Sequence, residues 1–132
     1  MDITYKLDII PDTDAVITVY ESSGINRPTK NKARITKMYA NADVVATAWH
    51  NNVLVGVARS ITDYCYCCYL SDLAVSNEFQ SLGIGKKLIT LTKEHIGDEC
   101  MLLLVAAPSA VNYYPKIGMD KLNDAFIIKR KL

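Results

Sequence analysis

Several features that would point to a particular partner or compartment are scarce or missing in this sequence. The 132 residues carry 15 basic and 14 acidic side chains, so the net charge of +1 favours neither nucleic acid nor an anionic membrane as a partner. No apolar run approaches the roughly 20 residues that span a bilayer, and the N-terminus lacks the basic start and apolar block of a signal peptide. We therefore expect a cytoplasmic protein that contacts neither nucleic acid nor a membrane.

Cysteine is limited to four residues, and their spacing does not describe a disulfide or zinc framework. Cys65, Cys67 and Cys68 fall in a segment typical of a β-strand, and Cys100 stands alone. Strand residues three apart point to opposite faces and lie roughly 10 Å from each other, which is beyond disulfide reach. No second C-x-x-C and no histidine pair is present to complete a zinc site. We expect buried, reduced cysteines and no metal.

What is present is ample apolar material arranged in alternating and helical patterns. Half of the residues are hydrophobic, and the length is that of a single domain, 1–132. The patterns predict an α/β sandwich, with a mixed central sheet of about six or seven strands flanked by about four helices. The expected strands are 3–10, 44–50, 53–61, 65–75, 101–107, 119–122 and 125–131, and the expected helices are 12–21, 29–42, one from Gly85 to a stop at 97–98, and one opening at 108–109.

The most informative stretch is residues 69–95, where a strand, a loop with two glycines and a helix follow one another. The first N–H groups of a helix have no partner within it, and glycine lets a backbone close onto a phosphate, so this order predicts an anion site. The loop is not a P-loop, because Lys87 stands where Ser or Thr is required. It is not a dinucleotide fingerprint either, because Leu88 stands at the position of the third glycine.

The wider pattern is more specific than the glycines alone. Leu73-x-Val75, then Gln80-x-x-Gly83-x-Gly85 and an amphipathic helix, resembles the acetyl-CoA signature [QR]-x-x-G-x-[GA] of the GNAT superfamily of N-acetyltransferases. A second segment, residues 110–119, resembles the family's A-x-x-[FY]-Y-x-K-x-G-F helix, with Tyr114 on the family's tyrosine and Met119 replacing its Phe. Pro115 should shorten or kink this helix. The two motifs together span roughly half of the chain.

The resemblance implies a GNAT-like fold in which two parallel strands splay apart and the arm of coenzyme A enters between them. It also implies transfer of an acetyl group from acetyl-CoA, the co-substrate, to a primary amine by direct attack in a ternary complex. The partners are then acetyl-CoA and an amine acceptor. The sequence leaves the oligomeric state open, with apolar residues 125–128 as a candidate edge for a homodimer. The residues implied to hold acetyl-CoA are Leu73, Ala74, Val75, Gln80, Ser81, Leu82, Gly83, Ile84, Gly85, Lys86, Asn112 and Tyr114.

Two side chains are candidates for the proton transfers of this reaction. An alkylamine has a pKa around 10 and must lose a proton before it attacks, and the leaving thiolate needs a proton. Tyr114 matches the tyrosine to which the family assigns the role of general acid. Asp72, a carboxylate in the middle of the key strand, would act as the base, directly or through water, or would be a structural carboxylate bonded to backbone or to a tyrosine. The sequence leaves these two roles of Asp72 open.

Alternatives to an enzyme acting on a small amine also remain open. A non-catalytic acyl-CoA-binding or sensor module would keep residues 80–85 but would need neither Tyr114 nor Asp72, so the presence of Tyr114 favours an enzyme. The acceptor would alternatively be a protein amine, although the balanced composition favours a small molecule. Loop residues specify little without geometry, so the acceptor is not identified at this point.

Overall fold

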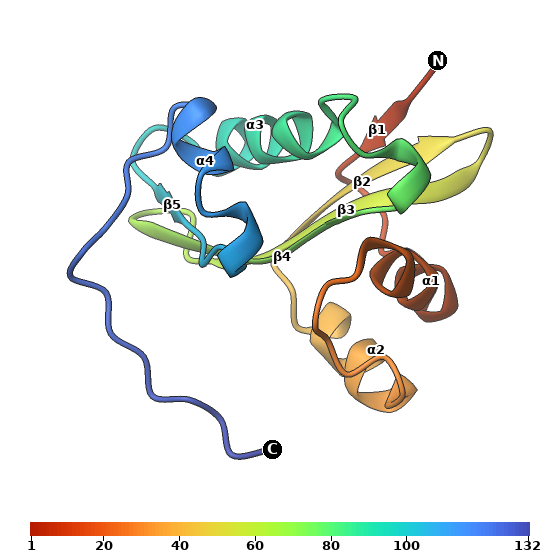
Figure 1. Ribbon diagram of the computed structural model, residues 1–132, viewed down its shortest axis with the longest axis horizontal. Helices are drawn as coiled ribbons and strands as arrows, with labels where there is room; N and C mark the ends of the chain where they lie inside the picture. The colour runs from red at the N-terminus through yellow and green to blue at the C-terminus, as the bar shows by residue number, and fades with distance from the viewer.

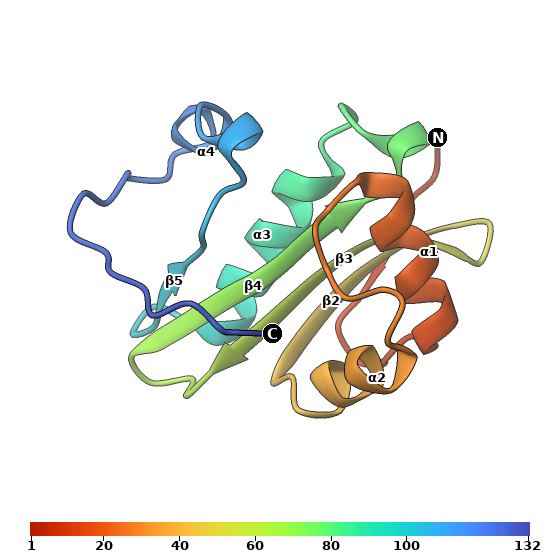
Figure 2. The same ribbon diagram turned by 60° about the horizontal axis from the view of Figure 1, so that its bottom comes forward.

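The computed structural model describes all 132 residues as a five-stranded sheet with helices on both faces (Figures 1 and 2). The strands lie in the order β1-β2-β3-β4-β5, and only β4 and β5 run parallel. Helices α1 and α2 cover one face, and α3 covers the other (Figure 2). The elements are β1 (Thr4–Lys6), α1 (Thr13–Ser23), α2 (Lys32–Ala40), β2 (Val44–His50), β3 (Val53–Thr62), β4 (Cys67–Val75), a 3₁₀ turn (Asn77–Phe79), α3 (Ile84–Ile96), β5 (Met101–Leu103), a second 3₁₀ turn (Pro108–Ala110) and α4 (Tyr113–Lys116).

The expectation of about six or seven strands is wrong, because the final hairpin does not form. Residues 119–132 contain no helix or strand, and the side chains of Phe126 and Ile128 are 96% and 100% exposed. A strand gains its stability from a neighbour, and this segment has none despite its apolar character. It leaves the body after α4 and reaches α2 only at its end, where Arg34 donates a hydrogen bond to the Leu132 carbonyl at 3.3 Å (Figure 1).

Most helix boundaries follow the local sequence signals. Helix α3 starts after Gly83 and stops before Gly97, and both glycines have a positive φ, of 82° and 89°, which favours glycine. Helix α2 begins at Lys32, later than expected, because the Asn31 side chain accepts the N–H of Arg34 and so caps the helix. Helix α4 is a single turn, which agrees with the limit that Pro115 was predicted to set.

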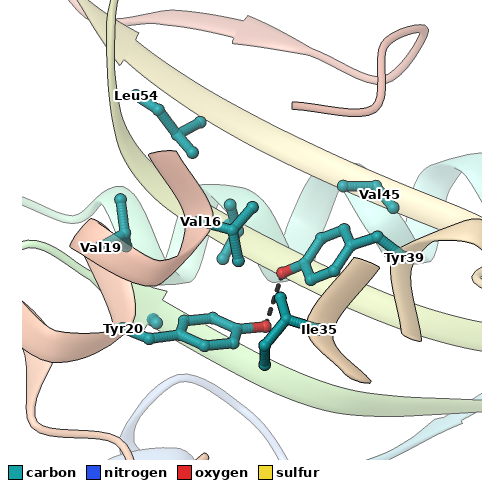
Figure 3. Packing of buried hydrophobic residues seen from close by; sticks show 9 residues of the cluster. Val16, Val19, Tyr20, Ile35, Tyr39, Val45 and Leu54 are labelled. Carbon is teal, nitrogen blue, oxygen red and sulfur yellow. Dashed lines mark hydrogen bonds between the residues drawn. The ribbon is translucent and has the colours of Figure 1, made fainter. Parts of the chain in front are cut away.

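The sheet separates two apolar clusters. On one face, α1 and α2 contribute Val16, Val19, Tyr20, Ile35 and Tyr39 to a fully buried layer (Figure 3). On the other face, α3 lies on small residues of β2 and β3. A Cβ added at Gly56 would lie 3.3 Å from both Ile84 Cγ2 and Leu88 Cδ1, so only glycine allows α3 to approach this closely. The close approach fixes the first turns of α3, and with them the loop that precedes the helix.

The edge of the sheet at β5 is less covered than predicted. Strand β5 ends at Leu103, and residues 104–107 do not continue it. Met101 and Val105 are 53% and 70% exposed, so the expectation that this strand is covered on both faces is wrong. None of the helices has the length and apolar character needed to cross a bilayer, the longest being α3 with 13 residues.

The cysteines are all free, but only two of them are buried. Cys68 and Cys100 lie in the core as expected, whereas Cys65 and Cys67 are exposed. Cys65 lies in the turn before β4, and Cys67, the first residue of β4, points away from the core while Cys68 points into it. Cys65 lies in a turn in which the Asp63 carboxylate accepts N–H bonds from residues 65 to 67.

Candidate active site

Strands β4 and β5 pair over only three residues, and their pairing ends at Tyr69 and Leu103. Beyond this point β4 continues to Val75 with one edge open. The Ser76 N–H donates to the Val55 carbonyl on β3 at 2.8 Å. Because N–H groups alternate between the two edges of a strand, those of Leu73 and Val75 face the open edge. An extended ligand can therefore add to β4 as a further strand would.

A β-bulge on β4 marks the start of this open edge. The register with β3 shifts between the pairs Arg59–Asp72 and Ser60–Leu70, so Ser71 is an extra residue without its own partner. The extra residue reverses the alternation of side chains along the strand. Leu70 and Leu73 both lie with the α3 cluster, whereas Asp72 turns to the face covered by α1 and α2.

The loop before α3 presents a run of free backbone donors. Each N–H from Ser81 to Lys86 lacks an acceptor within the chain, and the Lys87 N–H is the first to bond, to the Gly83 carbonyl at 3.0 Å. Ser81 and Gly83 have left-handed φ values of 65° and 82°, which turn successive N–H groups to one side as in an anion-binding nest. The first turn of α3 contains no acidic residue. The loop therefore has the geometry and the charge to bind a phosphate group.

Gln80 and Gly85 connect this loop to the end of β4. The Gln80 side chain donates from Nε2 to the Val75 carbonyl at 3.0 Å. A Cβ at Gly85 would lie 3.9 Å from Leu73 Cδ2 and 4.0 Å from Val75 Cγ2, so this part of the helix lies directly beside the open strand end. The structure thus brings the strand residues Leu73 to Val75 close to the loop residues Gln80 to Lys86. The sequence predicted the same two groups for one site.

Tyr114 lies on the same side of the sheet as the loop. It is half-buried on α4 and packs against the α3 cluster, to which Leu73 and Val75 also belong. Its ring meets that of Tyr113 edge to face, with the ring centroids 5.2 Å apart. Burial raises the pKa of the Tyr114 hydroxyl, so the group keeps a proton that it can donate. Asn112, just before α4, is exposed.

Asp72 lies on the opposite face of β4 from Tyr114 and is completely buried. Its Oδ2 accepts bonds from Arg59 Nε at 2.6 Å and from the Tyr20 hydroxyl at 2.7 Å, and its Oδ1 accepts from Arg27 Nε. Because Tyr20 donates to Asp72, the Tyr39 hydroxyl must donate to Tyr20 (Figure 3). Burial opposes ionisation of Asp72, but the bonds and charges of Arg59 and Arg27 outweigh it, so the pKa of Asp72 is lowered. The structure therefore does not place the two predicted catalytic side chains together.

The two arginines that hold Asp72 are not among the site residues predicted from the sequence. Arg59 lies on β3 opposite Asp72, and Arg27 reaches it from the loop between α1 and α2. Arg27 also donates from Nη2 to the Ser71 carbonyl at 2.7 Å, and so ties the loop to the bulge. One signal was available, because Arg59 is a charge within an otherwise apolar strand and needs a partner. Nothing local identified Arg27.

Thiol and metal chemistry find no support in the side chains around this site. The charge of Asp63 raises the pKa of the exposed Cys67 thiol, and burial raises that of Cys68, so neither cysteine is an activated nucleophile. No three His, Cys, Asp or Glu side chains converge as metal ligands. The site thus consists of backbone donors, an open strand edge and hydroxyl groups.

The parallel strands β4 and β5, joined through α3 with its run of free N–H groups, place the chain among α/β proteins with the geometry of a phosphate-binding loop. Comparison with known families identifies the family to which the chain belongs. The family model "Acetyltransferase (GNAT) domain" matches residues 16–129, and the chain belongs to this family.

Two curated relatives are uncharacterised N-acetyltransferases named ycf52. The one from Pyropia yezoensis is 32% identical over 73 residues, covering 54% of this chain and 42% of the relative. The one from Gracilaria tenuistipitata var. liui is 27% identical over 97 residues, covering 71% of this chain and 53% of the relative. The chain thus spans about half the length of the curated relatives it matches.

Solved structures share the fold. A Staphylococcus aureus protein of unknown function, described as a probable acetyltransferase, has a TM-score of 0.82 at 20% identity, covering 98% of this chain and 100% of the other. An aminoglycoside acetyltransferase from an uncultured soil metagenomic sample, in complex with sisomicin, has a TM-score of 0.70 at 21% identity, covering 98% and 96%. At these identities the likeness establishes the GNAT fold alone.

Proposed function

We propose that the chain is an N-acetyltransferase that moves an acetyl group from acetyl-CoA to a primary amine within a ternary complex. The observation that carries the proposal is the run of free N–H groups from Ser81 to Lys86 beside the open edge of β4. This arrangement suits a ligand with a phosphorylated end and an extended amide-bearing arm, which is the form of coenzyme A.

Each part of acetyl-CoA has a set of residues suited to it. The backbone of residues 81–86 would hold the pyrophosphate, with the exposed Lys86 adding charge. The open edge at Leu73 to Val75 would pair with the pantetheine arm. Gln80 would keep the loop at the strand end. Asn112, exposed just before α4, is included because of the resemblance to the family's motif.

The chemistry requires polarisation of a carbonyl and two proton transfers. Bound acetyl-CoA supplies a thioester whose carbonyl carbon forms the new bond to nitrogen while its bond to sulfur breaks. A free N–H at the open edge, from Leu73 or Val75, would donate to the carbonyl oxygen. The Tyr114 hydroxyl, which burial keeps protonated, would donate its proton to the departing sulfur.

We assign Asp72 a structural role, which the sequence had left open beside that of a base. Its two oxygens already accept bonds from two arginines and a tyrosine, and its lowered pKa makes it a poor proton acceptor near neutral pH. The proton of the amine would leave to water. The acceptor is proposed to be a small amine, and a cytoplasmic location is part of the same proposal.

The exposed C-terminal segment supports a further proposal, that of a homodimer. Residues 125–128 are apolar and unpaired, and the outer edge of β5 is also unpaired. If residues 125–128 of one copy paired with the β5 edge of another copy, both the apolar segment and the strand edge would be covered.

Calorimetric titration with acetyl-CoA, and separately with free coenzyme A, tests the central proposal. We expect micromolar binding of both by the wild-type chain and none by Gly85→Glu, whose side chain would place bulk and charge at the strand end. Gly85→Ala is the matched control, because its methyl group has only ordinary contacts. Release of thiol in the presence of amines would then establish transfer. Absence of binding by the wild-type chain would overturn the assignment, and binding without transfer would indicate a sensor module.

A further inference from the structure

Two guanidinium groups surround a single carboxylate at the bulge of β4. Asp72 is fully buried, the Arg59 side chain is 8% exposed and the Arg27 side chain is 23% exposed. Arg59 balances the charge of Asp72, and Tyr20 and Ser71 supply further bonds to its oxygens. Neither arginine has another carboxylate as a partner. The charge of Arg27 is therefore surplus to what the buried aspartate requires.

Arg27 also has donors that the protein does not use. Its Nη1 bonds to the Asn26 carbonyl and its Nη2 to the Ser71 carbonyl, each through one hydrogen, so one N–H remains free on each nitrogen. The Nη1 nitrogen of Arg59 makes no hydrogen bond, and it is not fully buried. Free donors with a surplus positive charge at a partly exposed position suit an anion.

The position of Arg27 relates this charge to the proposed reaction. It lies in the connection between α1 and α2, which crosses the sheet on the face opposite α3 (Figure 2). Its bond to Ser71 places it at the start of the open edge, two residues before Leu73. With the anion-binding loop and α3 on the other face, the side toward Arg27 is left for an incoming acceptor. Glu21, the other charged group bonded to this connection, is exposed and is screened by solvent.

We propose that the acceptor carries an acidic group in addition to its amine, and that the surplus donors of Arg27 and Arg59 bind that group. This inference rests on the proposed acetyl transfer and names the class of acceptor for the same site. An ammonium without an acid group meets only net positive charge at the bulge. An amino acid or a related amino-acid-like compound brings the missing anion, and the pairing holds its amine at the open edge.

Matched substrate pairs test the inference in a thiol-release assay. A series of ω-amino acids is compared with n-alkylamines of the same chain length, and phenylalanine with phenylethylamine. We expect kcat/KM to be about tenfold or more higher for the acid-bearing member of at least one pair, the size of a charge-assisted hydrogen bond. Added salt should reduce the preference.

Arg27→Gln should abolish the preference by lowering kcat/KM for the acid-bearing member alone. The variant should fold, since Arg59 still balances Asp72, and its affinity for acetyl-CoA should match that of the wild type. Lys30→Gln, an exposed change in the same connection, is the control and should keep the preference. Arg27→Lys should keep part of it.

Three results would overturn the inference while leaving acetyl transfer intact. They are equal kcat/KM for both members of every pair in the wild type, a preference that persists in Arg27→Gln, and an equal loss for both members in that variant. The last result would mean that Arg27 has only a structural role, that of joining the α1–α2 connection to the bulge of β4. Absence of acetyl-CoA binding would instead refute the proposed function itself.

Discussion

Arg59 on β3 and Asp72 on β4 face each other, with Nε and Oδ2 2.6 Å apart, on the sheet face covered by α1 and α2. A β4 without a bulge would point Asp72 to the opposite face. The bulge at Ser71 makes the contact possible, because the extra residue moves Asp72 to the face of α1 and α2. A buried carboxylate thus joins β3, β4, α1 and the α1–α2 connection.

Replacement of Asp72 by asparagine should destabilise the fold strongly. The amide keeps the shape but removes the charge, which leaves Arg59 buried without a counter-ion. We expect a loss of about 3–5 kcal/mol in the free energy of unfolding, measured in urea. Asp14→Asn breaks an exposed ion pair with Lys32 and should cost less than about 1 kcal/mol. Equal effects of the two changes would show that the buried pair is not what holds β4.

The lowered pKa of Asp72 makes a prediction about acid. A carboxyl group with a depressed pKa in the folded state stabilises the fold above its unfolded pKa of about 3.9, and this contribution is lost as the pH falls through the lower folded value. The contribution of Asp72 to the free energy of unfolding should therefore be constant from about pH 5 upward and decline only below about pH 4. Unfolding in urea at a series of pH values, for wild type and Asp72→Asn, measures it as the difference between the two. A difference that changes between pH 6 and 8 would point to a raised pKa and reopen the role of Asp72 as a base.

Gly56 and Gly85 should respond to alanine with opposite signs. A methyl group at Gly56 would lie 3.3 Å from two side chains of α3, so the helix must shift, and we expect a loss of about 1–3 kcal/mol. At Gly85 the methyl group has ordinary contacts, and removal of glycine from the first turn of a helix should stabilise by about 0.4–1 kcal/mol. Thermal unfolding of both variants gives the comparison. A neutral Gly56→Ala would show that α3 is less tightly seated than the contacts indicate.

Tyr114→Phe should reduce turnover far more than it weakens binding of acetyl-CoA. The change removes the hydroxyl that would protonate the departing sulfur, and loss of a general acid costs about a hundredfold or more in rate. Steady-state kinetics and calorimetry on the same preparation separate the two effects. Tyr113→Phe, on the neighbouring exposed ring, is the control and should turn over normally. Normal turnover of Tyr114→Phe would remove this residue from the chemistry.

The features of the site that could be predicted are those determined by residues close together in the sequence. Gly97 ends α3 where expected, the helix begins at Ile84, one residue before the expected Gly85, Pro115 limits α4, and Gln80 to Gly85 carries the loop motif. Features that depend on residues far apart in the chain could not be predicted. The bulge at Ser71 is a matter of register between two strands, and Asp72 meets Arg27 from 45 residues away. The final hairpin failed for the same reason, since apolar alternation over residues 119–131 does not specify a partner strand.

The exposed C-terminal segment leads to the last prediction, which concerns self-association. Phe126 and Ile128 are almost fully exposed in a stretch that has no partner in the monomer, and β5 offers an unpaired edge. Sedimentation at micromolar concentrations should reveal a dimer, and Ile128→Lys should shift it to the monomer, because a charge on an edge strand opposes pairing between copies. Leu122→Lys, in the same terminal segment but outside residues 125–128, is the control and should leave the dimer intact. A monomer at every concentration, in the wild type and both variants alike, would mean that the apolar segment does not mediate contact between two copies of this chain.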